Sequence, residues 1–182
     1  VIEGPENIKK ELPFEEAGLP VKIVNNHKPY KQRKVRILNG VHTAIVSVAY
    51  LSGKDTVLEC MEDPTIKKFI DKLIYNEIIP TLTLPKEELI SFANSVEDRF
   101  KNPFIVHNLL SISLNFTSKW KTRVLPSVKA YLEKNNELPE CLVFSFAAYL
   151  KFFRSVRLDE KGLYGLRENK EYLISDDRDI LE

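Results

Sequence analysis

The chain has 182 residues and a mass of 21.0 kDa, which is enough for one ordinary domain and short for two. Its 27 lysines and arginines nearly balance 26 aspartates and glutamates, so no bulk charge favours a nucleic acid or a membrane surface as partner. With 43% hydrophobic residues the chain can bury a sizeable core, which excludes an intrinsically disordered protein. The six glycines form no G-x-G-x-x-G or P-loop pattern, which argues against nucleotide binding by this chain alone.

The compartment is predicted from apolar runs and cysteines. No stretch approaches the roughly 20 apolar residues of a membrane span, and the first residues lack the basic and apolar regions of a signal peptide. Cys60 and Cys141 lie in apolar surroundings without C-x-x-C spacing, which predicts two small buried hydrophobes rather than a disulfide. We therefore expect a soluble, cytoplasmic protein. Because the chain starts at Val1 without an initiator Met, we also expect a piece of a longer polypeptide.

Residues 1–33 are the least helical part of the chain. Prolines at positions 5, 13, 20 and 29 break any long helix there, while residues 21–24 alternate as a short strand would. We interpret residues 1–33 as a linker or the tail of a preceding domain.

Residues 34–182 are predicted to form a mainly α-helical domain. Apolar residues recur at helical spacing over residues 34–52, 63–79, 85–100, 121–132 and 139–156. Asp63 before Pro64 is a helix start, and Pro126 is expected to kink its helix. The helix over 139–156 is the most apolar, so we expect it at the centre of the core. The polar tail from Asp159, with Gly162 and Gly165, is expected to be a turn-rich end.

Residues 33–43 carry the most informative polar pattern. On a regular helix Asn39 and His42 lie about 60° apart and Lys34 and His42 about 80° apart, so all three share one arc. A lysine in a first helical turn, where the helix dipole disfavours the ammonium form, can act as a general acid and base. Asn39 can donate a hydrogen bond to a carbonyl oxygen and His42 can bind a neighbouring hydroxyl. The alternative is that Lys34 and Arg36 are solvated, Asn39-Gly40 is a local irregularity and His42 is a core histidine.

The spacing Lys34-x4-Asn39-x2-His42 resembles the signature of the mannitol dehydrogenase family, the polyol-specific long-chain dehydrogenases. The longer phrase 33–43 and the later phrases 114–127 and 142–150 most resemble its tagaturonate reductase (altronate oxidoreductase) branch. The resemblance runs from about residue 1 to at least residue 155.

The resemblance implies a two-domain enzyme whose N-terminal Rossmann domain binds NAD and whose helical C-terminal domain binds substrate. This chain resembles the C-terminal domain, so the Rossmann domain of the same polypeptide is an implied partner. The implied reaction is metal-independent hydride transfer between NAD(H) and a sugar acid, with tagaturonate and altronate as the pair. Lys34 is implied as the general acid and base, Asn39 as the group that polarises the carbonyl, and His42 as the group that orients the substrate.

A uronate carries a carboxylate, so this branch needs a cationic partner that an enzyme for neutral polyols does not. Lys119, Lys121 and Arg123 are the candidates, and Lys119 falls where the family's basic residue on the substrate side lies. The alternative is a solvated helix start beside Trp120. His107 is a candidate for the pocket lining, although a core histidine is the favoured interpretation.

Other chemistries find less support. The three histidines show no i, i+4 pairing such as H-E-x-x-H, and we predict no metal site. No serine or cysteine lies in a G-x-S-x-G context, which disfavours covalent hydrolysis. Fructuronate reductase and mannitol 2-dehydrogenase stay open as sister activities. A helical interaction domain without chemistry stays open as the alternative from another class.

Overall fold

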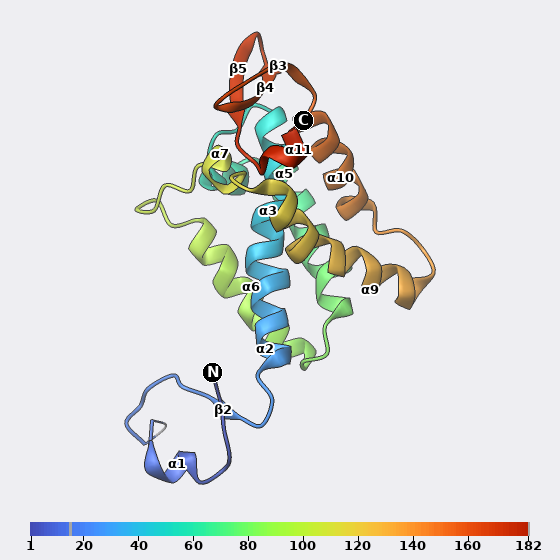
Figure 1. The fold of residues 1–182 in the computed structure, drawn as a ribbon. Coiled ribbons are helices and arrows are strands. Elements are labelled where there is room, and N and C mark those ends of the chain that lie inside the picture. Colours follow the sequence, from blue (N-terminus) through green and yellow to red (C-terminus); the bar gives the residue numbers. More distant parts are fainter. Residues whose placement is uncertain (15, 182) are drawn as a thin grey trace.

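The computed structural model describes residues 1–14 and 16–181, which form a small N-terminal lobe and a larger helical body (Figure 1). In the lobe, strand β1 (Ile2–Glu3) pairs in parallel with strand β2 (Ile23–Val24), and helix α1 (Ile8–Glu11) lies between them in sequence. The short strand expected within residues 21–24 is therefore confirmed.

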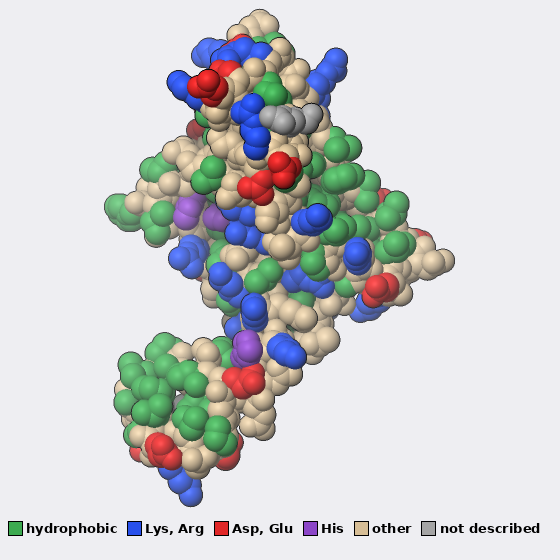
Figure 2. All heavy atoms as spheres, in the orientation of Figure 1, with side chains coloured by type: hydrophobic (Ala, Val, Ile, Leu, Met, Phe, Trp, Pro, Cys, Tyr) green, Lys and Arg blue, Asp and Glu red, His purple; other side chains and the backbone are tan. Residues whose placement is uncertain are grey.

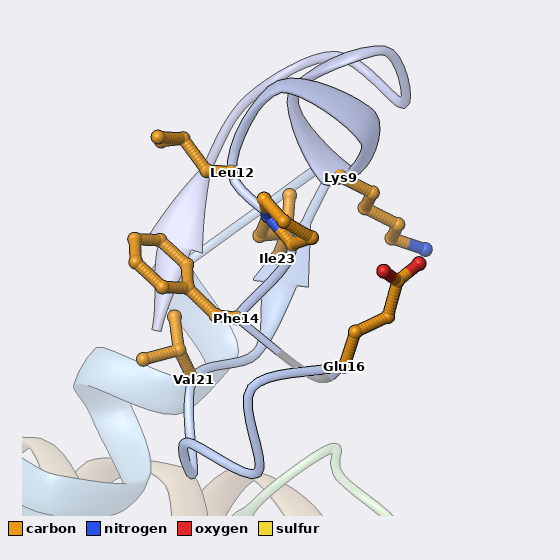
Figure 3. Close-up of a pocket in the computed structure, with 7 residues that line it drawn as sticks. Lys9, Leu12, Phe14, Glu16, Val21 and Ile23 are labelled. Atoms are coloured by element: carbon orange, nitrogen blue, oxygen red, sulfur yellow. The ribbon is translucent and has the colours of Figure 1, made fainter.

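The lobe encloses a small pocket of about 110 Å³ (Figure 3). Leu12, Phe14, Val21 and Ile23 line it from the segments that follow α1 and lead into β2. All residues that line this pocket belong to the lobe, and none belongs to the helical body.

One long helical run passes through the middle of the body (Figure 1). It consists of α2 (Lys28–Arg33), the π-helical segment η1 (Lys34–Gly40) and α3 (Val41–Leu51). The expected helix start at Lys34 is wrong, because Pro29 lies in the first turn of α2, where its missing N–H costs nothing. Every residue of α3 from Thr43 to Tyr50 is buried, so α3 is the centre of the core.

A second group of helices packs beside this run. It comprises α4 (Val57–Glu62), α5 (Pro64–Asp71), the π-helical η2 (Lys72–Ile78), the 3-10 turn η3 (Ile79–Thr81) and α6 (Lys86–Phe100). The predicted start at Asp63 is confirmed, because its carboxylate accepts the backbone N–H groups of Thr65 (2.9 Å) and Ile66 (3.1 Å). The helix expected over residues 85–100 is likewise present as α6.

The chain then returns across the body through short helices. These are α7 (Leu109–Ile112), α8 (Phe116–Lys119), the π-helical η4 (Trp120–Val124) and α9 (Leu125–Asn135). The kink expected at Pro126 takes the form of the wide π-turn that precedes it. Pro126 has no N–H to bond the carbonyl four residues earlier, and the helix widens there. Pro80 follows η2 in the same way.

Helix α10 (Glu140–Phe152) lies along α3 at the edge of the body (Figure 1). The Ser145 hydroxyl donates to the Ala44 carbonyl (2.7 Å), which marks the side of α10 that faces the core. The expectation that this helix lies at the centre of the core is wrong. Phe144 and Phe146 are 58% and 42% exposed, because α3 supplies the central position and α10 covers only one side of it.

The tail forms an antiparallel sheet of β3 (Ser155–Asp159), β4 (Gly162–Arg167) and β5 (Lys170–Ile174), followed by α11 (Arg178–Leu181). The expected turn-rich end is therefore wrong. Gly165 allows the cross-strand ring of Tyr172 to pack on it, since a Cβ at Gly165 would lie 2.2 Å from that ring. The Tyr172 hydroxyl donates to the Phe152 carbonyl (2.8 Å), which ties the sheet to α10.

The two cysteines are buried and free, as predicted, and burial raises the pKa of each thiol to about 12. The expectation of a mainly α-helical domain is confirmed. Within residues 1–14 and 16–181, none of the helices combines the length and the apolar character that crossing a membrane requires.

Candidate active site

The polar signature lies on the π-helical segment η1. Lys34 is its first residue, Asn39 its next to last, and His42 follows on α3. No proline follows η1 as it does η2 and η4, so the wide turn has another origin. Since π-turns without such a cause are frequent at functional sites, η1 is the best local candidate. The angular spacing computed for a regular helix does not apply here, because a π-turn holds more residues than an α-turn.

Lys34 and Asn39 are available to a ligand. Lys34 is exposed, and its ammonium makes no hydrogen bond or ion pair within the part of the chain that the structure describes. Asn39 is half-buried, and its backbone carbonyl accepts a hydrogen bond from the Thr43 hydroxyl (2.8 Å). Because α2 precedes η1, Lys34 is not in a first helical turn, and the expected influence of the helix dipole on it is wrong.

Gly40 brings a second segment to the signature. A Cβ at this position would lie 3.0 Å from the carbonyl oxygen of Arg123, so any larger residue would require η4 to shift away from η1. Helix packing therefore explains Gly40. The approach places the basic segment 119–123 beside the signature.

His42 lies in an aromatic cluster. Its ring stacks on Phe100 with the centroids 4.5 Å apart, and it meets the ring of His107 edge to face at 5.2 Å. The Nε2 atoms of both histidines are buried without a hydrogen-bond partner in the described part of the chain. His107, left open as pocket or core, thus belongs to the same cluster as His42.

The surroundings of His42 are cationic. Burial, together with repulsion from His107, Arg123 and Arg99, lowers the pKa of His42 to about 4. His42 is therefore neutral at neutral pH and acts as a hydrogen-bonding group rather than an acid. Figure 2 shows histidine side chains next to Lys and Arg side chains on this face of the body. Such a region favours an anionic ligand.

The three basic candidates differ in their environments. Lys119 is half-buried and its ammonium donates to the Ile112 carbonyl (2.9 Å); burial, then Arg123, lowers the pKa of Lys119. Burial likewise lowers the pKa of the half-buried Arg123. Lys121 is exposed and lines an apolar groove beside α10. The structure therefore brings Lys119 and Arg123 together and leaves Lys121 outside this pair.

Sequence reasoning missed several groups. Phe100 and Arg99 end α6, far from the signature in sequence, and no local pattern ties them to His42. The sequence predicts a role for Arg36 only as a solvated residue. In the structure Arg36 is 9% exposed, and its Nη1 has no partner in the described part of the chain. The arginine stands among mostly apolar residues at positions 35–41, and this pattern could have indicated that it is buried.

The strand–helix–strand unit of the N-terminal lobe does not fit the pyrophosphate of a dinucleotide cofactor. The parallel strands β1 and β2 flank α1, but the connection after β1 reads Gly4-Pro5-Glu6-Asn7. It has one glycine, a proline without an N–H and a carboxylate where a pyrophosphate would bind. Among residues 1–14 and 16–181, no group of three or more His, Cys, Asp or Glu side chains is placed to hold a metal ion.

Comparisons with known proteins identify the family. The mannitol dehydrogenase C-terminal domain matches residues 26–165. Altronate oxidoreductase of Yersinia pestis is 47% identical over 182 residues, covering all of this chain and 36% of the relative. That of Pectobacterium carotovorum is 49% identical over 176 residues, covering 95% and 36%. The chain thus spans about a third of the length of these curated relatives.

Two solved structures share the fold. A D-sorbitol dehydrogenase in substrate-free form superposes with a TM-score of 0.75 at 26% identity, covering 90% of this chain and 32% of that one. Mannitol 2-dehydrogenase of Pseudomonas fluorescens, in a ternary complex with NAD and D-mannitol, gives 0.73 at 24% identity, covering 89% and 31%. The family match covers well over half of the chain, and the chain belongs to the mannitol dehydrogenase family, of which it forms the C-terminal domain.

Proposed function

We propose that this chain is the substrate-binding and catalytic domain of a cytoplasmic, NAD-dependent tagaturonate reductase (altronate oxidoreductase). The enzyme would interconvert a keto-uronate and the corresponding polyol acid. One observation carries the proposal: the signature lies on a π-turn without a following proline, against a cationic segment that Gly40 brings close. Identities of 47% and 49% to altronate oxidoreductases support the choice of branch.

We assign the transfer of the proton to and from the substrate to Lys34. During reduction its ammonium would donate a proton to the carbonyl oxygen of the substrate, and in the reverse direction the amine would take the proton from the hydroxyl. The Asn39 amide would donate a hydrogen bond to the same oxygen and so stabilise developing negative charge. Neutral His42 would bind a neighbouring substrate hydroxyl through its ring nitrogens.

The carboxylate of the substrate is assigned to Lys119 and Arg123, with His107 lining the pocket beside them. Both cations are half-buried, so their hydrogen bonds to a carboxylate would be stronger than those of an exposed cation. Repulsion between the positive charges of Lys119 and Arg123 is an unfavourable interaction that an anionic ligand would relieve.

We assign the binding of NAD to a part of the polypeptide that lies outside this chain. Residues 34–182 would form the domain, and residues 1–33 would lead from an N-terminal Rossmann domain that holds NAD. The family model starts at residue 26, and the helical run that continues through Lys34 starts at Lys28, which supports a start of the compact domain slightly before Lys34.

The sister activities, fructuronate reductase and mannitol 2-dehydrogenase, differ in the substrate that the same arrangement would accept. A helical interaction domain without chemistry is the alternative of another class. The exposed, unpaired Lys34 and the orphaned ring nitrogens favour the enzyme, because a purely structural domain has no use for them.

The test is turnover by the full-length protein. NADH oxidation is measured with tagaturonate, fructuronate and fructose, for the wild type and for Lys34→Met. Loss of the acid and base should lower kcat with tagaturonate about 100-fold or more. Lys31→Met, at an exposed lysine of α2, is the matched control and should retain wild-type kcat.

Two outcomes would contradict the proposal. Wild-type kcat in Lys34→Met would remove the assigned role of Lys34. A full-length wild type that reduces none of these substrates would favour the interaction domain.

A further inference from the structure

Helix α10 has a second apolar side that nothing in the described chain covers. Val143, Phe146, Ala147 and Leu150 follow the i, i+3, i+4, i+7 spacing of a helix-packing stripe, opposite to Ser145 on the core side. Val143, Phe146 and Leu150 are 38%, 42% and 56% exposed. A helix that is apolar on both sides is typical of a position between two layers.

The stripe continues into a groove between α10 and the helices that precede it. The groove has a volume of about 470 Å³, and Val143 and Phe146 line it together with Trp120, Leu125 and Leu138. Figure 2 shows hydrophobic side chains gathered over α9 and α10 at the right of the view. The stripe and the groove form one continuous surface, which we call the α10 surface.

One residue that lines the groove has a buried polar group without a partner. Thr117 and Tyr149 also line the groove, and their hydroxyl groups hydrogen bond to each other (2.6 Å). Trp120 is 6% exposed, and its Nε1 has no hydrogen-bond partner within the described residues. Because a buried N–H without a partner is costly, the group that fills the groove should bring a hydrogen-bond acceptor.

We propose that an apolar helix from the part of the full-length polypeptide outside these 182 residues packs into the α10 surface and accepts a hydrogen bond from Trp120. This inference rests on that part of the proposed function which makes the chain one domain of a longer polypeptide. The chain covers 36% of its curated relatives, so the rest of such a polypeptide is nearly twice as long as this domain. A segment tethered to the domain meets the surface at a high effective concentration, which favours it over a second copy.

Thiol labelling of the full-length protein tests the inference. Ala147→Cys places a small thiol on the stripe with little change in shape, and Ser91→Cys places one on the exposed side of α6 as the matched control. Labelling is quantified for each peptide by mass spectrometry, so other cysteines do not contribute. We expect the thiol at position 147 to react at least roughly tenfold more slowly than the thiol at position 91, at every protein concentration.

Equal labelling rates at the two positions would overturn the inference. So would protection that disappears on dilution, because that result would assign the surface to a second copy. Leu150→Cys, at the exposed end of the stripe, gives the same comparison if Ala147→Cys fails to fold. Turnover of tagaturonate is measured separately on the same samples: protection without turnover would contradict the proposed chemistry alone, and turnover without protection would contradict this inference alone.

Discussion

The imidazole of His42 stacks on the phenyl ring of Phe100 with the centroids 4.5 Å apart and the planes within 1°. Stacking on an apolar ring removes water from one face of the imidazole, while His107, Arg123 and Arg99 repel a positive charge on it. The result is a histidine with a pKa of about 4, which stays neutral over the physiological range.

This shift predicts a pH dependence of stability. The folded-state pKa of His42 lies below the value of about 6.5 expected in the unfolded chain, so between these values the unfolded state binds more protons. Above pH 6.5 the neutral form of His42 contributes about 3 kcal/mol to the free energy of unfolding. This contribution is lost as the pH falls towards 4. The free energy of unfolding in urea, measured between pH 7 and 4.5, should fall less steeply for His42→Gln than for the wild type.

The exposed histidine of the N-terminal lobe provides the control for this experiment. His27→Gln also removes one histidine, but from a position beside Glu3 and outside the cluster. Because His27→Gln leaves the cluster around His42 intact, its slope should be steeper than that of His42→Gln. Equal slopes for all three proteins would show that His42 does not titrate as the structure predicts.

The contact between Gly40 and Arg123 predicts a second result. Alanine in a helix is favoured over glycine by up to about 1 kcal/mol, but its Cβ would lie 3.0 Å from a backbone carbonyl of a neighbouring helix. Because η4 is packed and Arg123 cannot move alone, we expect Gly40→Ala to lower the free energy of unfolding by about 1–2 kcal/mol. An unfolding curve at least as stable as that of the wild type would mean that η4 shifts without cost.

The same substitution should change substrate binding more than stability alone explains. Moving η4 away from η1 moves Arg123 away from the signature, so KM for tagaturonate in the full-length protein should rise while the protein remains folded. Unchanged KM in a destabilised variant would separate the packing role of Gly40 from the site.

Helix positions could be predicted from the sequence wherever a local signal exists. Asp63 before Pro64 has its capping carboxylate and first-turn proline in adjacent positions, and the structure has the helix start there. The prediction that the central helix starts at Lys34 is wrong. It takes Pro29 as a helix breaker, although proline is also favoured in the first turn of a helix. Local patterns thus predict that a proline matters but leave open which of its two effects operates.

The assembly of the site depends on contacts that are distant in sequence. The packing of Gly40 on Arg123 and of His42 on Phe100 joins residues more than fifty positions apart, and no spacing rule connects them. The apolar character of α10 predicted burial, but not that Val143, Phe146 and Leu150 would stay exposed in this chain. Composition measures how much apolar surface a helix carries, and only the fold shows which part of the polypeptide covers it.

The basic segment predicts discrimination between charged and neutral substrates. In the full-length protein, Lys119→Met and Arg123→Met should each raise KM for tagaturonate by about 10- to 100-fold, the value of one charge-assisted hydrogen bond. Their effect on KM for a neutral ketose should be much smaller, because that substrate has no carboxylate.

Lys121→Met is the matched control, since Lys121 is a neighbour in sequence but is exposed and lies in the groove beside α10. It should leave both KM values near those of the wild type. Equal increases for tagaturonate and the neutral ketose in Lys119→Met and Arg123→Met would contradict the assignment of the carboxylate to this pair.

The start of α10 predicts a contrast between two glutamates. Buried Glu77 on η2 accepts the backbone N–H groups of Cys141 (2.7 Å) and Leu142 (2.9 Å), which are first-turn donors that otherwise lack a partner. Glu140, in the same helical turn, is exposed and pairs with Lys72 at the surface. We expect Glu77→Gln to lower the free energy of unfolding by about 1–3 kcal/mol, because the amide can accept only one of the two hydrogen bonds well and its NH₂ is left buried.

The control Glu140→Gln should leave the free energy of unfolding close to that of the wild type, since exposed ion pairs contribute little. Both variants are measured by urea unfolding at neutral pH, and hydrogen exchange of the first turn of α10 reports the local effect. If Glu77→Gln cost no more than Glu140→Gln, solvent or another group would have to satisfy the N–H groups at the start of α10. The attachment of α10 to η2 through this carboxylate would then be unimportant. A larger cost for Glu77→Gln, with faster exchange confined to the first turn of α10, would establish Glu77 as the anchor of the helix that carries the α10 surface.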